Sequence, residues 1–296
     1  MSDSQWLLAE HQRRNQTTLK AHALFDTHRQ RVTDLIKQAG VLKQDEGVQA
    51  GRMCVLGAGN CNDLDLVELA NVFQEIVLVD IDSAAMEQAV ANGGGKALRG
   101  RVHVTESTDV TGIFERLQAA DVKDASSSAV TELLALLTVN PKLPSAPFDC
   151  IVSTCLISQL LDSVILALGA NHPGLVPLLL TLRRQHLRTI VHNLADHGRG
   201  IFIFDFVSSQ TLPNLMQIDE GRLSQTLVEA INAKNFFTGL NPFAVQAELQ
   251  SHADFVGLIA DVQLHSPWRW DIGKKQFAVS AISFQRKEAR WLGQRE

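Results

Sequence analysis

The chain has 296 residues, of which 45% are hydrophobic and 20% are charged, a composition typical of a globular protein with a full core. A net charge of -5 at pH 7 argues against a nucleic-acid substrate, because phosphate binding requires clustered Lys and Arg side chains. No run of residues approaches the ~18 uncharged apolar positions of a membrane-spanning helix, so we expect no membrane partner.

Residues 1–46 form the first predicted unit, a helical cap. Phe25, Val32 and Ile36 are spaced to share one face of an amphipathic helix. Basic side chains outnumber acidic ones in this segment, which we interpret as the solvated outer faces of packed helices. The segment does not begin with a basic stretch followed by an apolar core, so we predict no signal peptide and a cytoplasmic location.

A glycine turn follows the first predicted strand, residues 52–56. Gly57 and Gly59 have no Cβ, so a ligand can lie directly against the backbone at this turn. A second apolar strand, residues 76–79, ends on Asp80, whose carboxylate can accept both hydroxyls of a ribose. The sequence therefore predicts a site for an adenosine-containing cofactor.

Two cofactors suit this pattern. The spacing from Gly59 to Asp80 fits a nicotinamide dinucleotide as well as it fits S-adenosylmethionine. The dinucleotide fingerprint has a third glycine, which permits close packing of the helix on the strand, and here Asn62 takes its place. Because the fingerprint is incomplete, the later strands decide between the two.

Three further strands are predicted at residues 101–105, 147–154 and 200–206. This succession of strands, glycine turn and acidic strand end resembles the class I S-adenosylmethionine-dependent methyltransferases. The Phe148-Asp149 opening of the fourth strand is typical of that family. The resemblance spans about residues 50–286 and favours S-adenosylmethionine as the cofactor.

The C-terminal region supports the same reading independently. Residues 256–264 are a strand candidate, residues 266–275 are rich in turn formers, and residues 276–285 alternate apolar and polar side chains. These features predict an antiparallel hairpin closing an otherwise parallel sheet. Methyltransferases of class I end in this way, whereas nicotinamide-binding Rossmann domains usually do not.

The resemblance implies an α/β fold with a mostly parallel, seven-stranded Rossmann-like sheet, helices on both faces and the C-terminal antiparallel hairpin. We divide the chain into the N-terminal helical cap, residues 1–46, and a methyltransferase domain, residues 47–296. Helical insertions of that domain are expected at residues 113–146 and 208–255.

The resemblance also assigns cofactor-binding roles. Residues 57–60 (Gly57, Ala58, Gly59 and Asn60) would hold the methionine part and Asp80 the ribose. Ile81 would contact one face of the adenine, and Asp109 with Val110 would contact its edge. Ser153 and Thr154, at the end of the fourth strand, complete the predicted cofactor site.

One position departs from the family pattern. Many members have an acid two residues before the first glycine of the turn, and this chain has Val55. Either Asp63 or Asp65, in the first turn of the next helix, could supply the carboxylate that usually orients the glycine turn or the ammonium of the cofactor. The alternative for Asp63 is a helix-capping role, which negative charge at a helix N-terminus favours.

The acceptor side of the site is less well defined. Asp205 and His265, near the ends of the fifth and sixth strands, are weak candidates for a general base. The segment containing Trp268 and Arg269 is expected to overhang the site, where the indole offers a stacking surface and the guanidinium an anion-binding fork. Gln159, on the helix after the fourth strand, is a third candidate contact to the acceptor.

No metal site is expected. The four cysteines form no C-x-x-C pair, and no two histidines stand four residues apart.

Three functions remain open at this point. The first is a methyltransferase acting on a small-molecule acceptor by in-line transfer, and the second is a protein or RNA methyltransferase. The third is a diverged, non-catalytic S-adenosylmethionine-binding module, which Val55 and the lack of a clear base favour. Residues 153–156 replace the Asn/Asp-Pro-Pro-Tyr/Phe signature of amino-directed nucleic-acid methyltransferases, so that subclass is disfavoured.

Overall fold

The computed structural model describes residues 5–44 and 51–288. Its strands are β1 (Arg52–Leu56), β2 (Glu75–Val79), β3 (Val102–Val104), β4 (Phe148–Thr154), β5 (Leu194–Ser208), β6 (Ile259–Leu264), β7 (Trp268–Asp271) and β8 (Gln276–Arg286). Its α-helices are α1 (Trp6–Thr18), α2 (Asp26–Gln44), α3 (Leu66–Val72), α4 (Ser83–Gly93), α5 (Phe114–Leu117), α6 (Ala129–Leu136), α7 (Leu156–Leu168), α8 (Leu175–Asn193), α9 (Glu220–Asn232) and α10 (Pro242–Ser251). Short 3₁₀ helices are η2 (His22–Phe25), η3 (Gly95–Ala97), η4 (Ala120–Lys123) and η5 (Leu215–Gln217).

The strands form one mixed sheet in the order β3-β2-β1-β4-β5-β8-β6, with β7 also pairing with β8. β1 to β5 pair in parallel, and β8 pairs antiparallel with β5, β6 and β7. The strand order reverses between β1 and β4, which is the place where open α/β sheets bind ligands, beyond the carboxyl ends of the strands. The predicted α/β fold with its closing antiparallel hairpin is confirmed.

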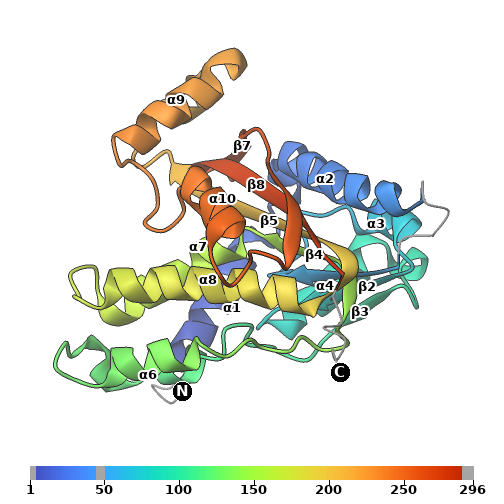
Figure 1. The fold of residues 1–296 in the computed structure, drawn as a ribbon. Helices are drawn as coiled ribbons and strands as arrows, with labels where there is room; N and C mark the ends of the chain where they lie inside the picture. The colour runs from blue at the N-terminus through green and yellow to red at the C-terminus, as the bar shows by residue number, and fades with distance from the viewer. Residues whose placement is uncertain (1–4, 45–50, 289–296) are drawn as a thin grey trace, which may run out of the picture.

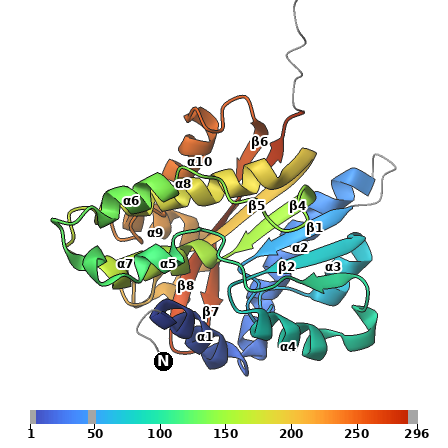
Figure 2. The ribbon, with the colours of Figure 1, turned by 90° about the horizontal axis from the view of Figure 1, so that it is seen from below.

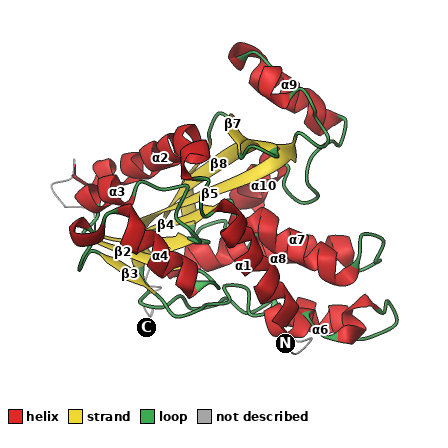
Figure 3. Ribbon diagram, turned by 180° about the vertical axis from the view of Figure 1, so that it is seen from behind, coloured by secondary structure: helices red, strands yellow, loops and turns green. Residues whose placement is uncertain are grey.

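Helices cover both faces of the sheet (Figures 1 and 3). On one face α2, α3 and α4 pack with the side chains of one buried cluster, and on the other α5 to α8 and α10 pack with a second, larger cluster. β1 and β2 are buried on both sides, so their continuous apolar sequences need no alternation. β5 alternates between the clusters, with Ile201 and Ile203 on the α2 face and Phe202 and Phe204 on the α8 face.

The predicted strand count was wrong by one, because part of the expected hairpin loop is itself a strand. β7 pairs with β8 in the register Trp268 to Val279 and Trp270 to Phe277. The turn formers of this segment misled the prediction, since the tight turn occupies only the residues around Gly273, where φ is +83°. Tryptophan is a strong strand former, and alternation places Trp268 and Trp270 on one face of the ribbon.

The N-terminal helices take different positions. α2 packs beside α3 on the face of the sheet, whereas α1 lies at the carboxyl ends of the strands, between α7 and α4 (Figure 2). The two expected insertions contain α5, η4 and α6 in the first and η5, α9 and α10 in the second, and α9 projects from the body (Figure 1). Whether residues 1–46 are a unit distinct from residues 47–296 stays a prediction. No described helix is long and apolar enough to cross a bilayer.

Candidate functional site

The glycine turn after β1 has a backbone conformation that favours glycine. Gly57 and Gly59 have φ of +77° and +45°, a region that L side chains rarely adopt. A Cβ at Gly57 would lie 2.6 Å from Cβ of Leu156, and one at Gly59 would lie 2.9 Å from Oδ1 of Asn15. The turn is tied to β2, because the backbone N–H of Gly57 donates to the carbonyl of Val79 at 3.0 Å.

Asp80 completes this turn from the end of β2. Its Oδ2 accepts the backbone N–H of Gly59 at 3.0 Å, and its Oδ1 accepts that of Asp82 at 2.9 Å. Burial raises the pKa of Asp80 to about 6, although these backbone hydrogen bonds act in the opposite direction. Asp80 therefore orients the glycine turn, the task left open by Val55 at the usual acidic position.

The two alternative carboxylates have other partners. Asp65 is the N-cap of α3, where its side chain accepts the N–H of Glu68 at 2.9 Å. Asp63 lies 3.4 Å from Nε2 of the buried His28 and does not line the pocket described next. The structure thus assigns helix capping to Asp65 and not to Asp63.

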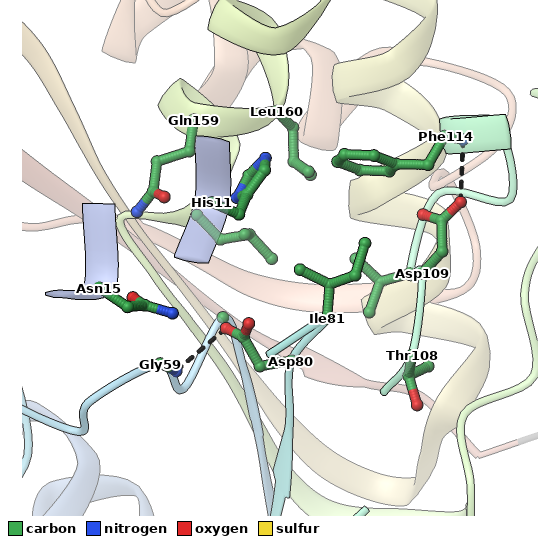
Figure 4. A pocket seen from close by; sticks show the side chains of 13 residues that line it. His11, Asn15, Gly59, Asp80, Ile81, Thr108, Asp109, Phe114, Gln159 and Leu160 are labelled. Atoms are coloured by element: carbon green, nitrogen blue, oxygen red, sulfur yellow. Dashed lines mark hydrogen bonds between the residues drawn. The ribbon is translucent and has the colours of Figure 1, made fainter. Parts of the chain in front are cut away.

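A pocket opens at the switch point of the sheet, with Asp80 and Gly59 at its floor (Figure 4). It contains about 480 Å³ of empty space, including the part open to solvent. Its lining comprises His11, Asn15, Gly57, Gly59, Asp80, Ile81, Thr108, Asp109, Val110, Phe114, Leu156, Gln159 and Leu160. The predicted residues Gly57, Gly59, Asp80, Ile81, Asp109, Val110 and Gln159 are thereby brought together.

Asp109 lines the pocket but is also bound locally. Its Oδ1 accepts the N–H and the hydroxyl of Thr111 at 2.8 and 2.6 Å, and its Oδ2 accepts the N–H of Phe114 at 2.9 Å. A carboxylate has about four lone-pair positions, so three bonds leave Oδ2 with one position for a ligand donor. Asp109 therefore fixes the loop that carries Phe114 and keeps one acceptor position for the pocket.

The helix α1 provides a wall of the pocket that the sequence did not reveal. His11 and Asn15 face the site from one side of α1, at the spacing of one helical turn (Figure 4). The side chain of Asn60 donates to the carbonyl of Asn15 at 2.6 Å, and that of Asn15 donates to Asp82 at 2.9 Å. Burial lowers the pKa of His11 to about 4, so the ring is neutral at pH 7 and packs edge-on against Phe114.

Five residues of the predicted cofactor site lie outside the lining: Asp63, described above, and Ala58, Asn60, Ser153 and Thr154. Ser153 is fully buried, and its hydroxyl is 2.8 Å from Nε2 of His186 on α8. The hydroxyl of Thr154 is within 3.5 Å of the carbonyl of Gly57 and supports the turn from behind. Ala58 is buried and Asn60 binds α1. These positions indicate that the four residues other than Asp63 hold the turn and its surroundings in place, because their side chains contact other parts of the protein and do not face the pocket.

The acceptor-binding role predicted for Arg269 and Trp268 was wrong. The guanidinium of Arg269 donates to the carbonyls of Met216 and Ile218 and to Glu220 at 2.6 Å, outside the pocket. Trp268 is buried, and its Nε1 donates to Nδ1 of His28 at 3.0 Å. Because β7 is paired into the sheet, its side chains pack against α2 and η5 and do not overhang the site.

The two base candidates differ in position. Nε2 of His265 is 2.8 Å from the hydroxyl of Ser283, and His265 does not line the pocket, so the structure gives it no part in the site. Asp205 is buried on β5 and accepts a hydrogen bond from Ser158 at 2.5 Å. Gln159 on α7 lines the pocket (Figure 4), and its contact with the acceptor stays a prediction.

The comparisons with known proteins show only distant likeness. No protein-family model and no curated protein matches the sequence. A solved structure of a putative S-adenosylmethionine-dependent methyltransferase from Methanococcus maripaludis has 14% identity and a TM-score of 0.42, over 95% of this chain and 94% of that one. The N-methyltransferase NodS from Bradyrhizobium japonicum has 11% identity and a TM-score of 0.42, over 86% of this chain and 96% of that one.

A putative RNA methyltransferase from Pyrococcus horikoshii has 13% identity and a TM-score of 0.42, over 86% of this chain and 82% of that one. Likeness of this degree identifies neither a substrate nor an activity, because one fold hosts many functions.

Proposed function

We propose that this chain is an S-adenosylmethionine-dependent methyltransferase that acts on a small-molecule acceptor. The observation that carries the proposal is the joint placement of the Gly57 to Gly59 turn and Asp80 beneath one pocket, at the switch point of the sheet. A glycine turn, which has no side chains to block a ligand, suits the methionine part of the cofactor, and the neighbouring carboxylate suits its ribose.

The free acceptor positions of Asp80 match a ribose. One lone pair of each carboxylate oxygen is used by a backbone N–H, of Gly59 or of Asp82. Each oxygen therefore keeps about one lone-pair position, and two vicinal hydroxyls can use them. Ile81 and Val110 supply the apolar contacts that an adenine ring needs, and Asp109 offers an acceptor to its amino group.

When bound, S-adenosylmethionine supplies the electrophilic methyl group, so the protein has to orient the acceptor and exclude water. His11 on α1 and Phe114 pack edge-on with ring centroids 5.3 Å apart over the pocket. Leu156 and Leu160 of α7 add apolar surface. These side chains favour a dry site, and α1 covers it.

The charge of the pocket favours a small acceptor over a nucleic acid. The described lining contains Asp80 and Asp109 but neither Lys nor Arg. The nearby Arg14 is paired with Glu10 and with Asp162. A polyanionic acceptor would find no free cation at the wall of the pocket, whereas a neutral or cationic small molecule meets no such penalty.

Calorimetric titration tests this function. S-adenosylmethionine and S-adenosylhomocysteine are expected to bind with one-to-one stoichiometry, and NAD⁺, the matched control, is expected not to bind. If S-adenosylmethionine is then converted to S-adenosylhomocysteine when an acceptor is present, the protein is an enzyme and not a non-catalytic binding module. Binding of NAD⁺ in place of both sulfur ligands would contradict the proposal.

A further inference from the structure

The methionine part of S-adenosylmethionine carries an ammonium group, which needs a hydrogen-bond acceptor in the site. In the proposed function the carboxylates of Asp80 and Asp109 serve the ribose and the adenine, and neither Asp63 nor Asp65 lines the pocket. Asn15 lines it from α1, which is N-terminal to the region that resembles the methyltransferases. The amide of Asn15 is therefore the candidate partner of the ammonium group.

The amide of Asn15 has a fixed orientation. Its Nδ2 donates to Oδ2 of Asp82 at 2.9 Å, and an ionised carboxylate can only accept hydrogen bonds. Oδ1 is therefore the atom that faces the glycine turn, where it lies 2.9 Å from the place that a Cβ of Gly59 would take. Oδ1 has no hydrogen-bond partner among the described residues, and the side chain is partly exposed. A free acceptor oxygen thus lies beside Gly59 (Figure 4).

Hydrogen bonds to the loop after the glycine turn hold this end of α1 in place. Nδ2 of Asn60 donates to the backbone carbonyl of Asn15 at 2.6 Å and to the hydroxyl of Thr18 at 3.1 Å. Nδ2 of Asn62 donates to the backbone carbonyl of Thr18 at 2.9 Å. The position of Asn15 Oδ1 is therefore set before a ligand binds, which reduces the entropy cost of the contact.

The charge around Asn15 favours a cation. Asp82 is buried, and its second oxygen accepts the backbone N–H of Ala85 at 3.2 Å. No described Lys or Arg forms an ion pair with Asp82 or with the nearby Asp80. Burying carboxylates without a cation costs free energy, and a bound ammonium group reduces that cost. Donation to Asp82 also polarises the amide of Asn15, which strengthens Oδ1 as an acceptor.

Two other uncharged polar side chains of the pocket, His11 and Gln159, are less suited to this role. The ring of His11 packs edge-on against Phe114 with centroids 5.3 Å apart, toward the part of the pocket assigned to the adenine (Figure 4). The amide of Gln159 has no hydrogen bond to a described residue that would fix its orientation. Asn15 combines a fixed orientation with a place against the glycine turn.

We propose that Oδ1 of Asn15 accepts a hydrogen bond from the ammonium group of S-adenosylmethionine, so that α1 contributes directly to cofactor binding. The inference rests on the proposed function. It makes α1 part of the cofactor site as well as its cover. A carboxylate in the same place would meet an acceptor oxygen and the negative charge of Asp82, so the contact also orients the methionine part.

Calorimetry on the full-length protein tests this contact with two analogues of S-adenosylhomocysteine. S-adenosyl-4-thiobutanoate lacks the ammonium group and keeps the carboxylate, whereas S-adenosyl-3-thiopropylamine lacks the carboxylate and keeps the amine. One hydrogen bond to a charged group corresponds to ~tenfold to ~150-fold in affinity. The wild-type protein should bind S-adenosylhomocysteine at least ~tenfold more tightly than the thiobutanoate, and in Asn15→Leu this preference should be at least ~tenfold smaller.

Two controls separate this contact from the position of α1. Thr18→Val removes a hydroxyl that binds Asn60 and does not line the pocket, so it loosens α1 while Asn15 keeps its amide. Its preference for S-adenosylhomocysteine over the thiobutanoate should equal that of the wild type. The preference for S-adenosylhomocysteine over the thiopropylamine should be the same in Asn15→Leu and in the wild type, because Oδ1 does not bind the carboxylate. Asn15→Met replaces Asn15→Leu if circular dichroism shows that the latter is unfolded.

The wild-type protein alone can overturn the proposal, if it binds S-adenosylhomocysteine and the thiobutanoate equally well. An Asn15→Leu protein that keeps the full preference would overturn it too, as would a Thr18→Val protein that loses as much of the preference. A change confined to the comparison with the thiopropylamine would assign Asn15 to the carboxylate and reject the ammonium contact. Failure of both S-adenosylmethionine and S-adenosylhomocysteine to bind the wild type would instead refute the proposed function, and this inference with it.

Discussion

Replacing Asp80 by asparagine changes the one side chain that the account places under the ribose. The asparagine side chain of the Asp80→Asn variant keeps one acceptor oxygen, and its amide would face one of the backbone N–H groups, of Gly59 or Asp82, that Asp80 now accepts. Each hydrogen bond to a charged group contributes ~1.5–3 kcal/mol. Loss of a single ribose bond of this kind weakens binding ~tenfold to ~150-fold, because ~1.4 kcal/mol corresponds to a factor of ten.

The assay is a calorimetric comparison of ligands that differ only in the ribose. The wild-type protein, with two ribose bonds, should prefer adenosine over 2′,3′-dideoxyadenosine by at least ~100-fold, and Asp80→Asn, which keeps one acceptor oxygen, should show a preference at least ~tenfold smaller. Asp65→Asn is the matched control, since Asp65 caps α3 outside the pocket, and its discrimination should equal that of the wild type. A folded Asp80→Asn protein that prefers adenosine as strongly as the wild type would refute the ribose assignment.

Three other predictions follow from the same geometry. The ionised form of Asp80 accepts the ribose hydroxyls, and its pKa is about 6. The affinity for S-adenosylhomocysteine should therefore be constant above pH ~7 and should fall as the pH drops below 6. A calorimetric affinity that does not change with pH would contradict this prediction. Asp109→Ala should lower both thermal stability and affinity, with Asp109→Asn milder in each, as measured by melting and titration. Arg269→Ala should leave cofactor affinity unchanged and cost ~1–3 kcal/mol in denaturant unfolding, because hydrogen bonds to the carbonyls of Met216 and Ile218 are lost together with the ion pair to Glu220; a tenfold weaker cofactor affinity would contradict its position outside the site.

The parts of the site that sequence reasoning found are those encoded locally. Gly57, Gly59 and Asp80 follow two apolar strands, and residue type alone indicates what each can do. The parallel strands were recognisable because their apolar runs are continuous and their ends carry polar residues. Such signals depend on neighbours in the chain, so no knowledge of distant packing was needed.

The parts that it missed depend on contacts between distant segments. Nothing in the sequence of α1 indicates that Asn15 meets Asn60, 45 positions later, or that His11 faces the pocket. The opposite error arose at Arg269, where a planar cation among tryptophans suggested ligand binding. Its actual partner, Glu220, lies on α9, 49 positions earlier. Pairing of β7 with β8 turned this segment away from the site.

Ser153 illustrates a further limit of strand-end reasoning. Adjacent residues at the end of β4 point to opposite faces of the sheet, so a change of one position exchanges the pocket side for the core side. Ser153 faces His186 in the core, and the hydroxyl of Thr154 reaches back to Gly57. The sequence places both residues at the correct edge of the sheet, but only the packing of α8 decides which way each points.

A crystal structure of the complex with S-adenosylhomocysteine would show where the ribose lies. We expect both ribose hydroxyls within hydrogen-bond distance of the Asp80 carboxylate, with the adenine between Ile81 and Val110 and the homocysteine part along the Gly57 to Gly59 turn. A ligand bound outside this pocket, or bound in it with its ribose turned away from Asp80, would contradict the assignment of Asp80 to the ribose.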